Sequence, residues 1–278
     1  MKKCLVTGAS GFVGSHLCRH LISKEWDVTA FVLPNETPSL ITPLLPKLHI
    51  EPIPQEISSL CSFFEANKFD LVFHLASVFL SDHKPEQIRP LFEANLLFGC
   101  HLLEAMSSGG CHSLVNTGTS WQHYENADYN PAKLYAATKQ AFEDLARYYV
   151  EAKELKMVTL KLFDTYGPND PRPKLFATLA KIAQTGEQLK MSPGLQWVDF
   201  VHVDIVCGAF LRAAQRLLDG KVETTETYGV SSGKPKPLRQ VVAEYAQENG
   251  VTLNIEWGGR PYRNREVMQL WTRFKTLD

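Results

Sequence analysis

Residues 6–14, VTGASGFVG, decide the fold of this chain. Glycines at positions 8, 11 and 14 follow a short apolar run, Lys3–Thr7, and precede a helical pattern over residues 15–24. Glycines at this point allow a tight strand-to-helix turn and a close approach of a pyrophosphate to the helix N-terminus. A glycine-rich turn without a ligand is the alternative. Because the motif stands between a predicted strand and a predicted helix, we predict that it binds a dinucleotide.

Strand-like and helical segments alternate through the first two thirds of the chain. Strands are predicted at residues 3–7, 27–33, 48–53, 70–76, 113–117 and 157–162, and helices at 15–24, 90–107 and 135–153. This alternation predicts an α/β fold with a doubly wound, parallel sheet of the Rossmann type.

A change of pattern after Tyr166 predicts a second, smaller region. Residues 1–166 form the predicted dinucleotide-binding domain, and an extended segment and helix within 197–225 return to it. Residues 167–196, with a helix at 175–185, and residues 226–278 form the predicted substrate-binding region.

Composition excludes several classes of partner. The chain has 278 residues, of which 44% are apolar and 21% charged, and its formal net charge is −1. That balance favours neither nucleic acid nor an anionic membrane, and no apolar run approaches the roughly 20 residues of a membrane span. Six scattered cysteines without a C-x-x-C pair indicate reduced thiols in a cytoplasmic protein and no metal site.

Tyr135 and Lys139 are four residues apart on a predicted helix, so both project from one face. A phenol with a pKa near ~10 is a poor acid or base at neutral pH, and an adjacent ammonium favours the phenolate. Hydroxyls at Thr117, Thr119 and Ser120, at the end of the preceding strand, can polarise a carbonyl group. A purely structural Tyr/Lys pair is the alternative. The glycine motif and these hydroxyls favour a catalytic set.

The segment TGASGFVGSHL (7–17) resembles the nucleotide-binding signature of the extended short-chain dehydrogenase/reductases, a family of NAD(P)-dependent nucleotide-sugar epimerases, dehydratases and reductases. The resemblance continues through HLAS (74–77), residues 93–105, YAATK (135–139), KLFDTYGP (161–168) and DFVHVDI (199–205). It implies a nucleotide-sugar substrate and, commonly, a homodimer. It also implies cofactor contacts by Gly8, Ser10, Gly11, Phe12, Val13, Gly14, Glu56, Ile57, Leu75, Ala76, Ser77, Asn95, Tyr135 and Lys139. For Asn95, a polar helix residue without such a role is the alternative.

The resemblance also selects the hydroxyl. Family members have a catalytic Ser or Thr four residues before a tyrosine, and Ser120 and Tyr124 have this spacing, with Thr119 as the alternative. In the 4,6-dehydratases Asp and Glu follow the hydroxyl. Here Trp121 and Gln122 follow, so dehydration is not expected, and we place both on the substrate side. His123 is interpreted as a packing or substrate-orienting group rather than a base.

The end of the second strand bears on the cofactor. Family members that prefer NAD have an acid at the position of Val32, and NADP users often have an arginine at that of Leu33. Neither is present, and the absence of a carboxylate favours NADP(H) over NAD(H). Four residues are candidates for contact with a 2′-phosphate: His16, Arg19, Asn35 and Lys47.

On the substrate side the chain departs from the family twice. Asp164 stands where most members have an asparagine that touches the sugar; it can accept from a sugar hydroxyl or cap the following turn. Val198 stands where many members have a diphosphate-binding arginine. Arg260 and Arg263 are candidates to replace it, with a solvated basic tail as the alternative, and Lys174 is a further candidate.

The catalytic region and the RPYR segment (260–263) look most similar to the members that reduce CDP- or dTDP-linked 4-keto-6-deoxysugars, such as CDP-abequose synthase. We therefore expect an NAD(P)-dependent nucleotide-sugar 4-ketoreductase. An epimerase with tightly held NAD⁺ and a non-catalytic NAD(P)-binding sensor are the alternatives. Phe142, Tyr148 and Tyr149 are the apolar and aromatic residues that favour a dimer through the helix of Tyr135.

Overall fold

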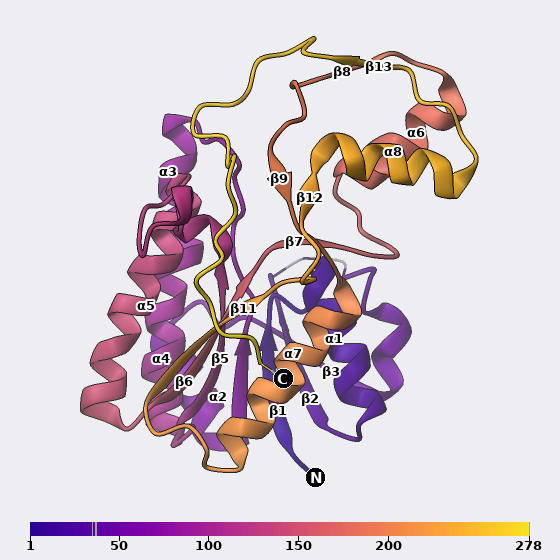
Figure 1. Ribbon diagram of the computed structural model, residues 1–278. Helices are drawn as coiled ribbons and strands as arrows, with labels where there is room; N and C mark the ends of the chain where they lie inside the picture. Colours follow the sequence, from indigo (N-terminus) through magenta and orange to yellow (C-terminus); the bar gives the residue numbers. More distant parts are fainter. Residues whose placement is uncertain (35, 37, 278) are drawn as a thin grey trace.

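A parallel sheet of seven strands forms the centre of the computed structural model, which describes residues 1–34, 36 and 38–277; Asn35 lies outside this description (Figure 1). The strand order is β11-β6-β5-β4-β1-β2-β3, and every neighbouring pair is parallel. These strands are β1 (Lys3–Thr7), β2 (Asp27–Val32), β3 (His49–Pro52), β4 (Leu71–His74), β5 (Ser113–Thr119), β6 (Lys156–Leu162) and β11 (Thr225–Val230).

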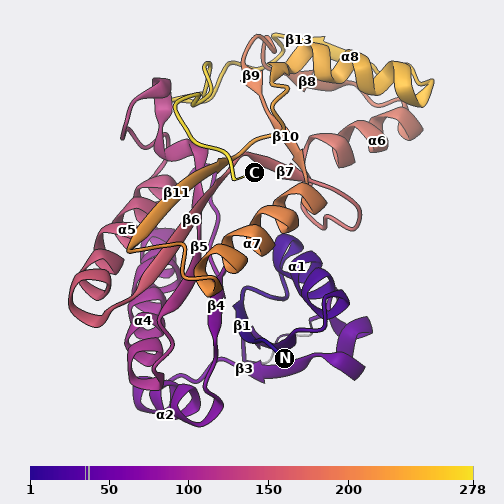
Figure 2. The same ribbon diagram turned by 60° about the horizontal axis from the view of Figure 1, so that its bottom comes forward.

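Helices cover both faces of the sheet, as Figures 1 and 2 show. One face carries α1 (Phe12–Ser23) and α7 (Val203–Leu218); the other carries α2 (Ile57–Asn67), α4 (Phe98–Gly109) and α5 (Leu134–Lys153). Alternate strand residues enter opposite cores: Val6 packs with the α1/α7 layer and Leu5 with the α2/α4/α5 layer. Burial on both faces explains why the strands are continuous apolar runs. The predicted doubly wound parallel sheet is confirmed.

Some elements differ from the sequence prediction. The helix expected at 90–107 consists of α3 (Ile88–Phe92), a π-helical turn (Glu93–Leu97) and α4. Helix α2, helix α8 (Leu238–Asn249) and strand β11 were not predicted. Four short 3₁₀ turns complete this part of the fold, at Thr42–Lys47, Pro85–Gln87, Ser120–Gln122 and Tyr124–Asn126.

A smaller group of elements lies beyond the carboxyl ends of the sheet strands (Figures 1 and 2). It has its own apolar cluster, in which Leu179 and Ile182 of α6 (Leu175–Thr185) pack with Val242 of α8. Its elements are α6 (Leu175–Thr185), α8, the pair β8 (Leu189–Met191) and β13 (Ile255–Trp257), and the pair β9 (Trp197–Val198) and β12 (Lys236–Pro237). The pair β7 (Asp164–Tyr166) and β10 (Phe200–His202) connects this group to the sheet.

The chain then returns to the sheet as a C-terminal strap (residues 262–277), drawn in yellow in Figure 2. Trp271 and Leu277 are buried in the α1/α7 core, and Gly229 N of β11 donates to Lys275 O at 2.9 Å. The predicted division of the chain into two parts stays a prediction. In the structure, β11 and the end of the strap lie with the sheet rather than with the smaller group.

Residues 1–34, 36 and 38–277 contain neither a membrane-spanning helix nor a metal-binding cluster. None of the helices there is both long and apolar enough to cross a bilayer. The same ranges contain no group of three or more His, Cys, Asp or Glu side chains that could hold a metal ion.

Candidate active site

The glycine motif forms a turn that is packed directly against the loop after β4. Gly8 has a φ of +68°, and a Cβ added there would lie 2.7 Å from Ala76 N. A Cβ at Gly14 would lie 2.1 Å from Gly8 O, so the first turn of α1 packs directly against the backbone of Gly8 and leaves no room for a side chain. Gly11 is exposed and precedes α1 as its N-cap. The free N–H groups at the start of α1 therefore lie at an open surface, as an anion requires.

The loop after β4 is tied to β1 by a hydroxyl group. Thr7 Oγ1 accepts from Leu75 N at 3.2 Å and from Ala76 N at 3.1 Å, so its proton is directed at His74 Nδ1, 2.9 Å away. This geometry requires a neutral His74. Burial, with a smaller effect from Lys139, lowers the pKa of His74 to about 3.

A cavity of about 270 Å³ extends from the glycine turn to the end of β5 and the start of α5. Most of the expected cofactor contacts and two of the three expected catalytic residues line it: Gly8, Gly11, Phe12, Val13, Gly14, Leu75, Ser77, Ser120 and Tyr135. Lys139 is buried one helical turn behind Tyr135. Ser10 and Ala76 flank the lining residues in sequence without being among them, and Glu56 and Ile57 lie at the start of α2, also outside this lining.

Two adjacent hydroxyls at the end of β5 have different environments. Thr119 caps the 3₁₀ turn Ser120–Gln122: its Oγ1 accepts from Trp121 N at 3.3 Å, and its N–H donates to Gln122 Oε1 at 2.9 Å. Ser120 lines the cavity, and its hydroxyl has no hydrogen bond to residues 1–34, 36 or 38–277. The geometry therefore favours Ser120 as the hydroxyl available to a ligand.

Tyr135 and Lys139 occupy successive turns of α5, with Lys139 Nζ 5.9 Å from the Tyr135 ring centroid. Burial raises the pKa of Tyr135 to about 12, against opposing effects of a hydrogen bond with Ser77 and the charge of Arg172. Burial lowers the pKa of Lys139 to about 8, against the charge of Glu143. At neutral pH the phenol is thus a protonated acid beside a charged ammonium.

Asn95 fixes the loop that carries Ser77. Its Oδ1 accepts from Ser77 Oγ at 3.1 Å and from Val78 N at 2.8 Å. Its Nδ2 donates to Val78 O at 3.1 Å and to Thr138 Oγ1 of α5 at 3.0 Å. All of these bonds are internal, so the structure assigns Asn95 to holding the loop against α5 rather than to the cavity wall.

A second cavity, of about 620 Å³, lies between the sheet and the smaller group of elements. Trp121, Asp164 and Lys174 line both cavities, so the two adjoin there. Arg260 and Arg263 line the second cavity, and neither guanidinium group has a hydrogen bond or ion pair within the described part of the chain. The expected substrate-side residues, apart from Gln122, are therefore brought to one place.

The charges at this junction are partly buried. Lys174 Nζ lies 4.0 Å from Asp164 Oδ1. Burial raises the pKa of Asp164, against the charges of Lys174 and Arg172, and burial lowers the pKa of Lys174, against the charge of Asp164. Asp164 can therefore accept a hydrogen bond from a ligand, and its partner Lys174 also lines the cavities and can contact the same ligand.

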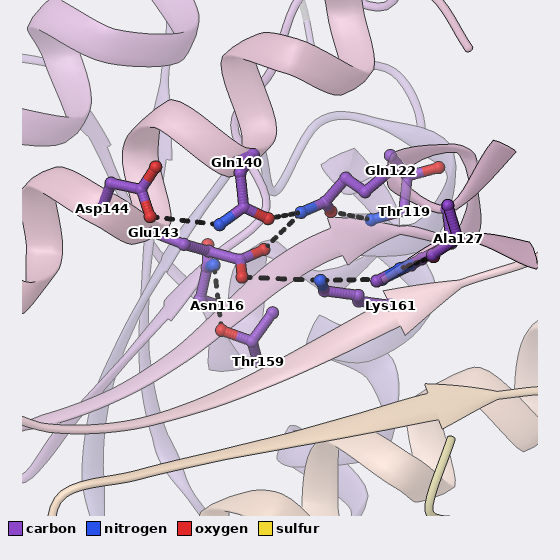
Figure 3. Close-up of polar contacts among 10 residues, drawn as sticks. Asn116, Thr119, Gln122, Ala127, Gln140, Glu143, Asp144, Thr159 and Lys161 are labelled. Atoms are coloured by element: carbon purple, nitrogen blue, oxygen red, sulfur yellow. Dashed lines mark hydrogen bonds and ion pairs between the residues drawn. The ribbon is translucent and has the colours of Figure 1, made fainter. Parts of the chain in front are cut away.

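The sequence places Gln122 on the substrate side, but the structure turns it inward (Figure 3). Its side chain is fully buried, and its Nε2 donates to Gln140 Oε1 and to Glu143 Oε1, each at 2.9 Å. It lines neither of the two cavities. The capping bond to Thr119 requires this orientation, because it directs Gln122 Oε1 back at the strand end.

The described candidates for a 2′-phosphate contact are engaged elsewhere. His16 Nε2 lies 3.0 Å from Pro168 O, and Arg19 donates to Leu40 O at 2.9 Å. Lys47 lines a separate cavity with Met1 and Asp27, which lie at the amino ends of the strands. Lys47 thus lies at the amino ends of the strands, whereas the glycine turn lies at the carboxyl end of β1.

Three site residues were not identified from the sequence. Arg172 lines both cavities, forms two bonds with Asp170 (2.6 and 2.7 Å) and lies 4.7 Å from the Phe12 ring centroid. Phe79 packs edge-on against Tyr135 with ring centroids 5.0 Å apart. Gln196, 6% exposed, lines the second cavity, and its Oε1 has no hydrogen-bond partner in the described chain. They lie in loops where periodicity carries no signal.

The fold and the site define a dinucleotide-binding enzyme built on a Rossmann-type sheet. Residues 4–228 match the NAD dependent epimerase/dehydratase family, and the chain belongs to it. The predicted family of extended short-chain dehydrogenase/reductases is therefore confirmed.

Individual relatives span several activities. The chain is 27% identical to CDP-abequose synthase of Salmonella muenchen, covering 96% of this chain and 88% of that protein. It is 23% identical to UDP-glucose 4-epimerase 2 of Arabidopsis thaliana, covering 96% and 86%. Among solved structures it is similar to MoeE5 in complex with UDP-glucose and NAD, with a TM-score of 0.79 and 26% identity over 96% of this chain and 87% of that one.

Proposed function

We propose that this protein is an NAD(P)H-dependent nucleotide-sugar oxidoreductase that reduces the 4-keto group of a CDP- or dTDP-linked 4-keto-6-deoxyhexose. One observation carries the proposal: Ser120 and Tyr135 line the same cavity, and the two residues that follow Ser120 in the sequence are not acids. Trp121 lines the wall there, and Gln122 is bonded inside the protein. A ketone can be polarised and protonated at this place, whereas elimination of water would need further acid/base groups. The similarity to CDP-abequose synthase supports the same reading.

The glycine turn fits a dinucleotide, since the exposed Gly11 leaves the first N–H groups of α1 open beside the Arg172 cation. When bound, NAD(P)H supplies the hydride for the reduction. Ser120 Oγ donates a hydrogen bond to the substrate carbonyl, and Tyr135 transfers its phenolic proton to the oxygen. The Lys139 ammonium stabilises the phenolate that Tyr135 becomes.

The second cavity is the proposed place for the nucleotide part of the substrate. Within the described residues the guanidinium groups of Arg260 and Arg263 have no partner, and they can bind a diphosphate with two parallel bonds. Lys174, which lies 4.0 Å from Asp164, can add a further cation. Gln196 Oε1 has no donor among the residues that the structure describes, and it can accept from an N–H group of the base. The UDP-glucose complex of MoeE5 supports a nucleotide-sugar at this type of site.

We further propose a preference for NADP(H). The MoeE5 structure contains NAD. Neither Val32 nor Leu33 bears a carboxylate that would repel a 2′-phosphate, but Glu36 Oε2 lies at the end of β2 and accepts from Leu33 N at 3.2 Å, so a 2′-phosphate has to be bound beside this group. The ratio of kcat/KM for NADPH and NADH measures this preference; a ratio below one contradicts it.

The decisive experiment follows the reduced-nicotinamide absorbance of purified protein with NADPH and a panel of CDP- and dTDP-4-keto-6-deoxyhexoses. We expect one nucleotide class to be reduced with stoichiometric cofactor oxidation. No oxidation across the panel would overturn the proposal.

An epimerase is the second candidate, favoured by the similarity to UDP-glucose 4-epimerases, which the chain matches over nearly its full length. Protein that purifies with bound NAD and interconverts nucleotide-sugars without net cofactor turnover would establish this function instead.

A homodimer is proposed through the outer face of α4 and α5. Leu145 and Tyr148 on α5 and Leu97 just before α4 are 43%, 61% and 52% exposed. Phe142 cannot contribute to this face, contrary to the sequence analysis, because its ring is buried beneath α5.

A further inference from the structure

A buried polar network joins the turn after β5, helix α5 and strand β6, which are separate in sequence (Figure 3). Gln122, in the turn after β5, donates to Glu143 Oε1 of α5 at 2.9 Å. Glu143 Oε2 lies 3.6 Å from Lys161 Nζ of β6. Lys161 Nζ lies 3.0 Å from His123 Nε2, whose ring stacks on Trp271 of the C-terminal strap at 3.9 Å. The network thus reaches from the Ser120 turn to the end of the chain.

Glu143 stands at the branch point of this network. Tyr135, Lys139 and Glu143 follow each other at four-residue intervals, so all three lie on one face of α5. The side chains of Glu143 and Lys161 are 12% and 6% exposed, and Lys139 is 4% exposed. Glu143 is ion-paired with Lys161 and lies one helical turn from Lys139 on α5. Screening by solvent is weak at such a position, so a Glu143 carboxylate favours the charged form of both lysines.

We propose that Glu143 is a positioning residue for the reaction. It holds the Ser120 turn against α5 through Gln122, and it supplies the buried counter-charge that Lys139 shares with Lys161. The inference rests on the proposed roles of Ser120, Tyr135 and Lys139, and it adds a residue that touches neither cavity.

The other groups around Lys139 do not supply a negative charge. His74 of β4 faces it and is kept neutral by burial. Tyr135, on its own helix, is a protonated phenol with Arg172 on its cavity side. Among the described residues, Glu143 is therefore the anion that acts on Lys139.

The groups around Glu143 are also fixed. Lys161 faces it from β6, and the amides of Gln122 and Gln140 lie beside it, with Asp144 next to it on α5. His123 faces Lys161, and burial together with the Lys161 charge lowers the pKa of His123 to about 4, so it is neutral. Burial raises the pKa of Glu143, and the Lys161 charge and the hydrogen bond from Gln122 oppose this shift and favour the carboxylate.

Removal of the Glu143 charge has a defined consequence. Without the carboxylate, the pKa of Lys139 falls below its value of about 8, because burial is then unopposed. Lys139 loses its proton at lower pH, and a neutral amine does not stabilise the phenolate of Tyr135. The decline of kcat with rising pH should then begin at lower pH.

Glu143→Gln tests this, because the amide keeps an oxygen that can accept from Gln122. Lysine labelled with ¹³C at Cε reports the titration of Lys139 by NMR, with the signal assigned by its loss in Lys139→Met. We expect the midpoint to fall by about one pH unit relative to the unsubstituted protein. Asp144→Asn removes a charge one residue away on an exposed side chain and should leave the midpoint unchanged.

A second variant separates the lysines. The double variant Glu143→Gln/Lys161→Met also removes the Lys161 charge, so no buried ammonium is left without its partner to destabilise the fold. If Glu143 served only to neutralise Lys161, the Lys139 midpoint would return to its original value; our proposal requires it to stay low. A restored midpoint, or an unshifted one in the single variant, overturns the proposal.

The Gln122 arm has its own readout. Gln122→Ala breaks the bond that ties the Ser120 turn to α5, and we expect kcat to fall at least tenfold with KM for the cofactor unchanged. An unchanged kcat would contradict the positioning role. The NMR titration needs no sugar, so it stands even if no 4-keto sugar is reduced, whereas the sugar panel tests the proposed function alone.

Discussion

Burial shifts the pKa values of Tyr135 and Lys139 in opposite directions. The pKa of Tyr135 is raised to about 12 and that of Lys139 lowered to about 8. The phenol therefore holds its proton across the neutral range, as the donor in a reduction must. The sequence motif predicted the pair; only the depth of burial sets the protonation state of each.

Tyr135→Phe should lower kcat roughly 100- to 10,000-fold, since general acid catalysis is lost while the ring still packs against Phe79. Cofactor affinity should change little, and steady-state kinetics with a fluorescence titration of the cofactor measures both. Equal loss of cofactor binding would indicate a structural role. Full retention of biological activity would instead revive the non-catalytic sensor.

His74 gives the fold a pH dependence. Its pKa is about 3 in the folded protein and near ~6.5 when unfolded, so between these values the unfolded state binds the additional proton. The free energy of unfolding should therefore fall as pH decreases from 6.5 to 3, with a slope of up to about 1.4 kcal/mol per pH unit from this group. Urea denaturation between pH 7 and 4 measures it.

The matched variants are His74→Asn and His83→Asn. The asparagine at 74 retains an acceptor for Thr7 and does not titrate, so the slope should become shallower. His83 is exposed, and its replacement should leave the slope unchanged. Equal slopes in all three proteins would contradict the assignment to His74.

At the scale of elements, the glycine turn shows how a loop depends on its neighbour. Gly8 and Gly186 have nearly the same φ, +68° and +69°, but only Gly8 has atoms within 3 Å of an added Cβ. Gly186→Ala should cost about 1–2 kcal/mol for the left-handed conformation alone. Gly8→Ala should cost more and should abolish cofactor binding, because the Ala76 backbone must move. Calorimetry of both variants, with a cofactor titration, compares them.

The C-terminal strap binds the loop between β5 and α5. Thr272 N donates to Asn126 Oδ1 at 3.0 Å, Arg273 bonds Asn126 O, and Trp271 stacks on His123. Trp271→Ala should destabilise the fold by about 3–5 kcal/mol, since Trp271 is 7% exposed. Trp197→Ala, at a 46% exposed tryptophan, should cost much less in the same denaturation experiment. Similar losses for both would argue against a structural strap.

At the scale of the whole molecule, the outer face of α4 and α5 bears on assembly. Leu145→Glu combined with Tyr148→Glu puts two charges on the proposed dimer face, and we expect sedimentation to show a monomer. Leu195→Glu, at a 60% exposed leucine in the smaller group of elements, is the control and should leave the assembly unchanged. An original protein that sediments as a monomer would contradict the proposed dimer.

The sequence by itself determined the Rossmann-type sheet and the glycine turn and predicted the Tyr135/Lys139 pair, because alternating apolar runs and short-range spacing are local properties. The choice of Ser120 came from the family resemblance. Helix α2 carried a readable pattern, with Ile57, Leu60 and Phe64 on one face, but the π-helical turn at Asn95 carried none. Only the tertiary structure decided that Gln122 points inward and that Asn95 ties a loop. It alone brought Glu143 to Lys161 and Arg172 to Phe12. These contacts join residues from separate elements, and only the packing of those elements brings them within bonding distance.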